Sequence, residues 1–184
     1  MTLSTSAMPS KDKKESFIID RCDHAGLKAT CGAVWRAVSD TVMGGLSRAR
    51  LAAASIDGQS CLCLSGEVSL ENNGGFVQAS LDLMVAGSYY DASRFTGVEL
   101  EVRGDGKPYN IHLRTGDTRL VWQSYRAGFV ASQDWQLIRL PFNEFVPHRI
   151  SVPLDTSILR KLGIVSIGKG GDVKIYFRRL AFYQ

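Results

Sequence analysis

The sequence predicts an all-β protein, either a β-sandwich or a barrel. Three observations carry this prediction: short alternating apolar and polar runs follow one another, turns with glycine or asparagine separate them, and helical periodicity is scarce. The turns include "NNGG" at residues 72–75 and "RGDGKP" at residues 103–108. With 184 residues, 45% of them hydrophobic, the chain suits a single domain with a substantial core.

Up to eleven segments are expected to be strands, because each combines alternating or β-branched residues with a turn signal at its end. In chain order they are residues 17–20, 35–40, 46–55, 61–70, 74–84, 97–104, 109–116, 122–131, 135–142, 163–168 and 173–183. One helical turn is expected in "DTSILRKLG", with Asp155 as its N-cap and Gly163 as its C-cap. Residues 1–16 are expected to form a disordered tail before a domain of residues 17–184.

Alternation assigns two faces to the strands expected at residues 76–83, 97–104 and 109–116. Every second residue is apolar and is expected to point to the core. The intervening residues, with Trp122 and Arg126 at the rim, are expected to form one polar face: Gln78, Ser80, Glu99, Glu101, Asn110, His112 and Arg114. Such a face can bind a protein partner, stack on a sugar ring and bind its hydroxyls, or be a solvated surface with paired charges.

Patterns of catalysis and of metal binding are scarce. "GKGGD" at residues 168–172 lacks the ending of a P-loop, and "GDG" at residues 104–106 is no dinucleotide fingerprint, so both are expected to be hairpin turns. Glu99 and Glu101 share a face of one strand, but three nearby groups favour cross-strand pairing over catalysis, namely Arg103, Arg114 and His112. The histidines and cysteines show no ligand spacing. We therefore expect no catalytic residue, no metal and no cofactor.

The cysteines and the N-terminus favour a cytoplasmic protein. Free, buried thiols in a reducing compartment are expected for Cys22, Cys31, Cys61 and Cys63. The chain has no apolar run long enough to span a bilayer and no pattern of a signal or transit peptide, so no membrane insertion is expected. The formal charge of +4 is concentrated in residues 139–184, which marks either a basic face for an acidic partner or a solvated surface. No nucleic-acid partner is expected.

Two blocks combine a polar turn with paired glycines: "VSDTVMGGLSRARL" at residues 38–51 and "NNGGF" at residues 72–76. Asp40 is expected to accept hydrogen bonds from nearby backbone groups, and Val42 and Met43 to tuck under the sandwich as a plug. The glycines are expected to adopt positive φ or to pass close to a neighbouring strand. We expect both blocks to lie together at one end or edge of the sandwich, as a structural motif of Asp40, Met43, Gly44, Gly45, Asn72, Asn73, Gly74, Gly75 and Phe76.

Three stretches carry a family resemblance: "WRAVSDTVMGGLSRARL", "GEVSLENNGGFVQASLDL" and "WQLIRLPFNEF". They resemble the complex I intermediate-associated protein family, the thirty-kilodalton NADH:ubiquinone oxidoreductase assembly factor, in its bacterial branch. The resemblance implies a jelly-roll β-sandwich of the galactose-binding-domain-like type. It also implies a non-catalytic assembly module that binds a protein partner, with respiratory complex subunits as candidates. The alternative is a carbohydrate-binding module that uses the polar face, and the third reading is an enzyme.

Overall fold

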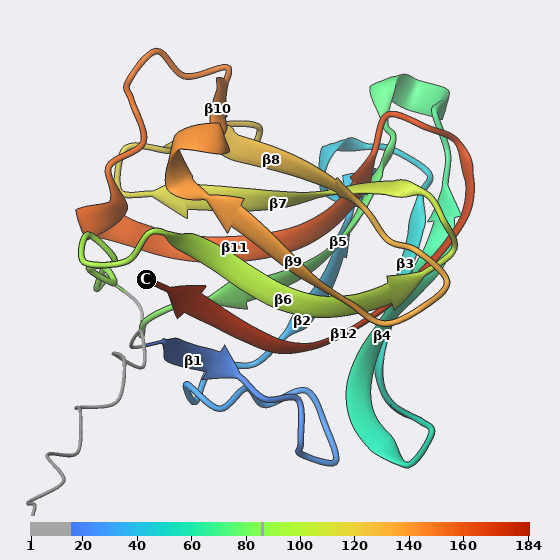
Figure 1. Cartoon of the computed structure of the whole chain (residues 1–184). Coiled ribbons are helices and arrows are strands. Elements are labelled where there is room, and N and C mark those ends of the chain that lie inside the picture. Colours follow the sequence, from blue (N-terminus) through green and yellow to red (C-terminus); the bar gives the residue numbers. More distant parts are fainter. Residues whose placement is uncertain (1–15, 86) are drawn as a thin grey trace, which may run out of the picture.

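The computed structural model describes residues 16–85 and 87–184, which form two packed antiparallel sheets (Figure 1). The predicted all-β class is confirmed, since the described residues contain strands and short 3-10 turns but no α-helix. The expected tail lies, apart from its last residue, outside the described residues. The strands are β1 (Phe17–Asp20), β2 (Arg36–Ser39), β3 (Arg48–Ile56), β4 (Gln59–Val68), β5 (Phe76–Asp82), β6 (Gly97–Gly104), β7 (Pro108–Thr115), β8 (Ser124–Val130), β9 (Gln136–Pro141), β10 (Val146–His148), β11 (Leu159–Ile167) and β12 (Gly171–Tyr183).

Each sheet is assembled from strands that are distant in sequence. The first, here called the β6 sheet, has the order β3-β4-β12-β6-β9, with β1 also paired to β12. The second, here called the β7 sheet, has the order β10-β8-β7-β11-β5-β2. Four 3-10 turns connect the strands: η1 (Asp40–Met43), η2 (Glu71–Asn73), η3 (Phe142–Glu144) and η4 (Thr156–Ile158). Figure 1 shows β7 and β11 of one sheet lying over β6 and β12 of the other.

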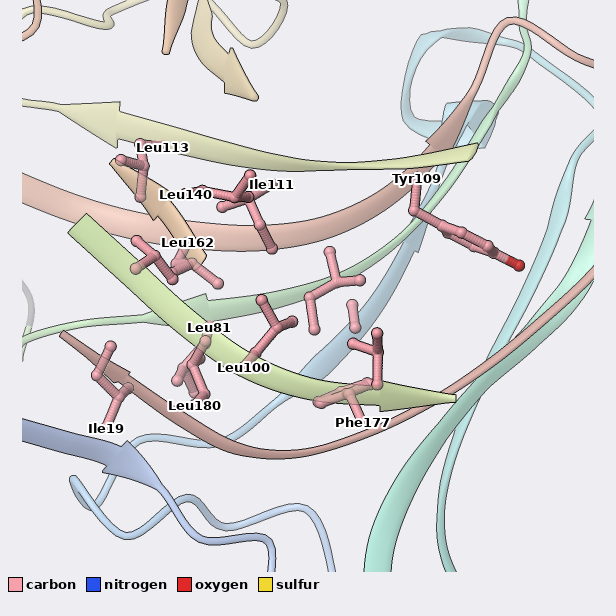
Figure 2. Close-up of a cluster of buried hydrophobic side chains, with 14 of the residues drawn as sticks. Ile19, Leu81, Leu100, Tyr109, Ile111, Leu113, Leu140, Leu162, Phe177 and Leu180 are labelled. Atoms are coloured by element: carbon pink, nitrogen blue, oxygen red, sulfur yellow. The ribbon is translucent and has the colours of Figure 1, made fainter. Parts of the chain in front are cut away.

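The core lies between the two sheets, where the alternation predicted it. Val98, Leu100 and Val102 of β6 are fully buried, as are Ile111 and Leu113 of β7. Figure 2 shows side chains from both sheets gathered in one apolar cluster. Burying a large apolar side chain stabilises the fold by about 1.5–3 kcal/mol, so this cluster fixes which face of each strand points inward.

The helical turn before β11 is shorter than the sequence predicts. The cap is confirmed, because the Asp155 carboxylate accepts a hydrogen bond from the Ser157 backbone N–H at 2.9 Å. The turn ends at Ile158, however, and Gly163 lies inside β11 instead of capping a helix. Pairing of β11 with β5 on one side and β7 on the other outweighs the weak local preference for a helix. The three-residue strand β10, which contains a proline and pairs with β8 alone, was not predicted.

The four cysteines are free, as expected, but they are not equally buried. Cys22 and Cys61 are buried and Cys63 is half-buried. Cys31 is exposed, so the expectation of a buried thiol is wrong at this position. Cys31 lies in a turn, where its backbone N–H donates to the Ile19 carbonyl and its side chain has no strand face to point into. In the described part of the chain, no helix has the length and apolar character needed to cross a membrane.

Candidate functional site

A groove of about 710 Å³ lies on the outer face of the β7 sheet. Apolar, basic and amide side chains line it. The apolar ones are Val38, Val42, Met43, Phe76, Val121, Trp122, Val165 and Ile167, the basic ones are His112, Arg114, Arg126, His148, Arg149 and Lys161, and the amides are Asn73, Gln78 and Gln123. No aspartate or glutamate is among the described residues that line the groove. The lining therefore combines hydrogen-bond donors and positive charge with apolar contact area.

Strand register places the floor of the groove. Arg126 of β8 faces His112 of β7, and His112 faces Gly163 of β11. Gly163 in turn faces Ser80 of β5, so one row of side chains crosses four strands. A Cβ atom on Gly163 would lie 2.3 Å from the Gln78 amide nitrogen, so glycine leaves the room that the amide occupies.

His112 is a buried polar group in this floor. His112 is 8% exposed, and its Nε2 atom has no hydrogen-bond partner among the described residues. Burial lowers the pKa of His112 to about 3, and the charges of Arg126 and His148 contribute in the same direction. The imidazole is therefore neutral at neutral pH and adds a polar surface without adding charge.

The groove arginines are held by neutral groups. Arg114 donates to the backbone carbonyls of Thr118 at 3.2 Å and Leu120 at 2.9 Å. The Arg126 Nε donates to the Ser124 hydroxyl at 2.9 Å. Burial lowers the pKa of both guanidinium groups, and a second arginine near each adds to the effect. Both are thus oriented cations in a partly desolvated setting.

Carboxylates compensate little of this charge. Lys161 pairs with Asp82 at 2.9 Å. By contrast, Arg114, Arg126 and Arg149 form no ion pair with any carboxylate in residues 16–85 and 87–184. The groove consequently presents net positive charge to whatever enters it.

The rim is formed by exposed apolar side chains from two loops. Val42 and Met43 of η1 are 66% and 45% exposed, and Val121 and Trp122 are 62% and 46% exposed. The expectation that Val42 and Met43 form a buried plug is therefore wrong. The η1 turn directs Asp40 inward instead, and the residues that follow Asp40 project outward over the groove.

Asp40 is fully buried and holds the two glycine blocks together. Its carboxylate accepts hydrogen bonds from the Ser47 backbone N–H at 2.9 Å, from the Phe76 N–H at 3.2 Å and from the Gly75 N–H. The Ser47 hydroxyl donates to it as well. Burial alone would raise the pKa of Asp40, but the hydrogen bonds from Ser47, Gly75 and Phe76 hold that pKa below its usual value.

The glycines of both blocks meet this carboxylate, which confirms that the blocks lie together. A Cβ atom on Gly45 would lie 2.2 Å from Asp40 Oδ1, and one on Gly74 would lie 2.5 Å from Asp40 Oδ2. Gly44 adopts a left-handed φ of +84°. The Asn72 amide completes the junction by donating to the Gly44 carbonyl at 3.4 Å. Close approach and positive φ, as predicted, exclude larger residues here.

The structure brings six of the nine residues predicted for the polar face and its rim to the groove: Gln78, Ser80, His112, Arg114, Trp122 and Arg126. Asn110 lies on the same face next to Gly128 but is not among the lining residues. Glu99 and Glu101 are a correction, because β6 belongs to the other sheet and they lie on the opposite side of the molecule. Alternation shows which residues share a face within a strand, but it does not show which sheet that strand joins.

Glu99 and Glu101 belong to an ion-pair network on the β6 sheet. Glu99 is 2% exposed, and its carboxylate oxygens lie 3.0 Å from the Arg139 Nε and 3.6 Å from the Arg179 Nη2. The carboxylate oxygens of Glu101 lie 2.6 Å from the Arg178 Nε and 3.8 Å from the Arg179 Nη1. These distances confirm that the two glutamates pair across strands, but the cations are not the three that the sequence pointed to.

Sequence reasoning missed several lining residues. His148 comes from the short strand β10 and Arg149 follows it directly, and neither stands in a recognisable pattern. Val165 and Ile167 of β11 could not be told from core residues, because alternation does not separate two faces in so apolar a strand. One signal was present for Val42 and Met43, since two apolar residues in a polar, glycine-rich turn are unusual for a surface loop.

Comparison with known structures supports the fold. A family 11 carbohydrate-binding module of a cellulosomal cellulase from Clostridium thermocellum superposes with a TM-score of 0.71 at 10% identity, over 93% of this chain and 95% of that chain. The family 11 module in complex with a β-1,3-1,4-mixed-linked tetrasaccharide gives 0.68 at 12% identity, over 91% and 94%. A family 30 module from the same organism gives 0.64 at 15% identity, over 91% and 96%. At these identities the likeness shows a shared jelly-roll fold.

Comparison of sequences supplies the family. No curated protein matches the chain significantly. The family model of Complex I intermediate-associated protein 30 (CIA30) matches residues 27–174, which include the η1 turn, the "NNGGF" block and all the described lining residues of the groove. Because the match covers most of the chain, this protein belongs to the complex I intermediate-associated protein 30 family.

Proposed function

We propose that this chain is a non-catalytic binding module that captures a protein partner in the groove of the β7 sheet, as an assembly factor for a respiratory complex would. Family membership supports an assembly role. The groove supports capture by binding, because its lining offers apolar contacts and hydrogen-bond donors, with no carboxylate or thiol among the described lining residues. Respiratory complex subunits are the candidate partners, and the proposed place of action is the cytoplasm.

The exposed apolar rim is the observation that carries this proposal. Val42, Met43, Val121 and Trp122 are each 45% exposed or more and gather around one groove, whereas other exposed apolar side chains, such as Leu137, are not among its lining residues. Methionine, tryptophan and arginine are enriched at protein interfaces, and anchors of this kind carry much of the binding energy. A rim of this composition beside oriented arginines is the arrangement expected of a protein-docking groove.

Affinity capture with matched variants tests the proposal. The wild-type protein, a Val42→Ser/Met43→Ser double variant and Trp122→Ala are used to capture partners from the native host, and captured proteins are identified by mass spectrometry. Leu137→Ser is the control, because Leu137 is also 45% exposed but lies on β9 of the other sheet. We expect respiratory complex subunits with the wild type and the control, and about tenfold less with the rim variants at unchanged melting temperature. Equal capture by all four proteins would refute the groove as the docking site.

Carbohydrate binding is the second candidate, and one observation favours it. The fold is shared with a module whose structure holds a mixed-linked tetrasaccharide. Trp122 at the rim could stack on a sugar ring while Gln78 and Gln123 bind its hydroxyls. Binding on a glycan array that disappears with Trp122→Ala and persists with Leu137→Ser would favour this function over the first.

A further inference from the structure

We propose that the groove recognises an acidic peptide segment of its partner, whose carboxylates pair with Arg114, Arg126 and Arg149 while neighbouring aliphatic residues cover Val42 and Met43. This inference rests on the proposed function and specifies the chemistry of the partner. It follows from the charge of the groove, from the way its arginines are held, and from the composition of its rim.

The charge of the groove differs from that of other arginine-rich parts of the fold. Elsewhere Arg139, Arg178 and Arg179 each lie within 4 Å of a glutamate. Arg114 and Arg126 have no such partner among the described residues, although both are half-buried. A guanidinium that has lost part of its hydration without gaining a counter-charge attracts a carboxylate strongly.

The arginines are also oriented before any partner arrives. Backbone carbonyls of Thr118 and Leu120 hold Arg114, and the Ser124 hydroxyl holds Arg126. These neutral acceptors restrict the side chains and leave their positive charge uncompensated. Little side-chain freedom is then lost when an anion binds, so the pairing contributes more to affinity than it would with freely moving side chains.

The rim distinguishes a peptide from an acidic glycan. Three of its four exposed apolar side chains, Val42, Met43 and Val121, are aliphatic, and Trp122 is the one aromatic. Sugar rings stack on aromatic faces, whereas aliphatic surface is complementary to leucine-like side chains. The combination of arginines and an aliphatic rim therefore fits carboxylates flanked by apolar residues, which is a pattern of peptides.

Fluorescence anisotropy with defined peptides tests this specificity. The probe is a labelled short peptide in which glutamates flank a pair of leucines, and its control is the same peptide with glutamine in place of each glutamate. The proteins are the wild type, Arg126→Gln, Arg149→Gln and a control, Arg50→Gln, which removes an exposed arginine from β3 of the other sheet. Polygalacturonate serves as a competitor that carries carboxylates without apolar side chains.

We expect the glutamate peptide to bind the wild type and Arg50→Gln equally well. Each groove variant should bind this peptide about tenfold more weakly. The wild type should bind the glutamine peptide about tenfold more weakly than the glutamate peptide. Added salt should weaken the interaction. Equal binding of both peptides, loss of binding in Arg50→Gln, or no binding of the glutamate peptide would overturn the inference. Tighter binding of polygalacturonate, lost in the same groove variants, would identify a glycan instead.

The two proposals fail in distinguishable ways. If the rim variants lose the respiratory subunits but the arginine variants keep them and the glutamate peptide does not bind, the protein-docking function stands and the acidic specificity is wrong. If the rim variants capture partners as the wild type does, the docking function itself is wrong, whatever the peptides show.

Discussion

The outward faces of the two sheets are both rich in arginine, but their charges are arranged in opposite ways. On the β6 sheet, Glu99 and Glu101 are placed between Arg139, Arg178 and Arg179, and every one of these cations has a carboxylate partner. On the β7 sheet, Arg114 and Arg126 face a groove whose described lining holds no carboxylate. The same alternation of polar and apolar residues thus produces a self-compensated surface on one side and an uncompensated one on the other.

This difference separates structural charge from charge that is available for binding. A buried carboxylate such as Glu99 requires its cations, because removing them leaves an unpaired charge in a poorly solvated place. The groove arginines satisfy no internal carboxylate, so the fold does not need their charge. Stability measurements on the first face and binding measurements on the second should therefore respond to different substitutions.

The largest expected effect comes from removing the cations around Glu99. The double variant Arg139→Gln/Arg179→Gln leaves a glutamate side chain that is 3% exposed without its partners. We expect unfolding in urea to show a loss of about 3 kcal/mol. The matched control, Arg126→Gln/Arg149→Gln in the groove, should lose less than about 1 kcal/mol. Similar losses in both double variants would show that the two faces do not differ as described.

The second prediction tests how rigidly the rim of the groove is fixed. Gly45→Ala places a Cβ atom 2.2 Å from Asp40 Oδ1 and must displace a carboxylate that holds three backbone N–H groups. We expect a loss of about 2 kcal/mol in the free energy of unfolding. Gly170→Ala is the control, since its added atom would meet its neighbours at an ordinary 3.5 Å or more, and it should change stability by less than about 0.5 kcal/mol. A melting curve of Gly45→Ala that matches the wild type would contradict the role assigned to Asp40.

The third prediction uses pH to probe the floor of the groove. Because the folded-state pKa of His112, about 3, lies below the unfolded value of 6.5, its contribution to stability is complete above pH 6.5 and is lost as pH falls toward 3. At pH 5 the loss is about 2 kcal/mol, from the shift in pKa at about 1.4 kcal/mol per unit. Urea unfolding at pH 7 and pH 5 should show this loss in the wild type and in His24→Asn, an exposed control, but a clearly smaller loss in His112→Asn. Identical pH dependence in all three proteins would argue against a buried, neutral His112.

The smallest effect is expected for Arg149→Gln alone. Arg149 is exposed, and its positive charge repels the guanidinium of Arg126 and so contributes to the lowered pKa of Arg126. Removing it should leave the free energy of unfolding within about 0.5 kcal/mol of the wild type, with any change toward greater stability. A loss of more than about 1 kcal/mol would mean that Arg149 has a structural partner and would weaken the contrast between the two faces.

Much of the fold follows from the sequence because burial is periodic within a strand. The apolar positions Val98, Leu100 and Ile111 are buried as alternation requires, and the glycine blocks meet as their composition suggested. Assignment of strands to sheets does not follow from alternation, and this is why Glu99 was assigned to the wrong face. Strand order depends on long-range pairing such as that of β12 with β6 and β4, which local sequence does not encode.

The groove was predictable in its floor but less so in its rim. His112 and Arg114 share a strand with clear alternation, so their common face could be inferred. Val42 and Met43 were expected to be buried, because an apolar pair in a turn usually seeks the core. Their exposure depends on Asp40 occupying the interior position, and that arrangement requires backbone N–H groups from Gly75 and Phe76, far away in the sequence.

The Asp40 junction also has a consequence for how this family could diversify. The junction is made by one carboxylate, the Ser47 hydroxyl, the Asn72 amide and backbone groups, and the side chains of Val42 and Met43 take no part in it. Both residues can therefore be substituted with little effect on folding, while the turn that presents them keeps its shape. Evolution or a protein engineer could in this way change what the rim recognises at a cost to stability close to that of an ordinary surface substitution.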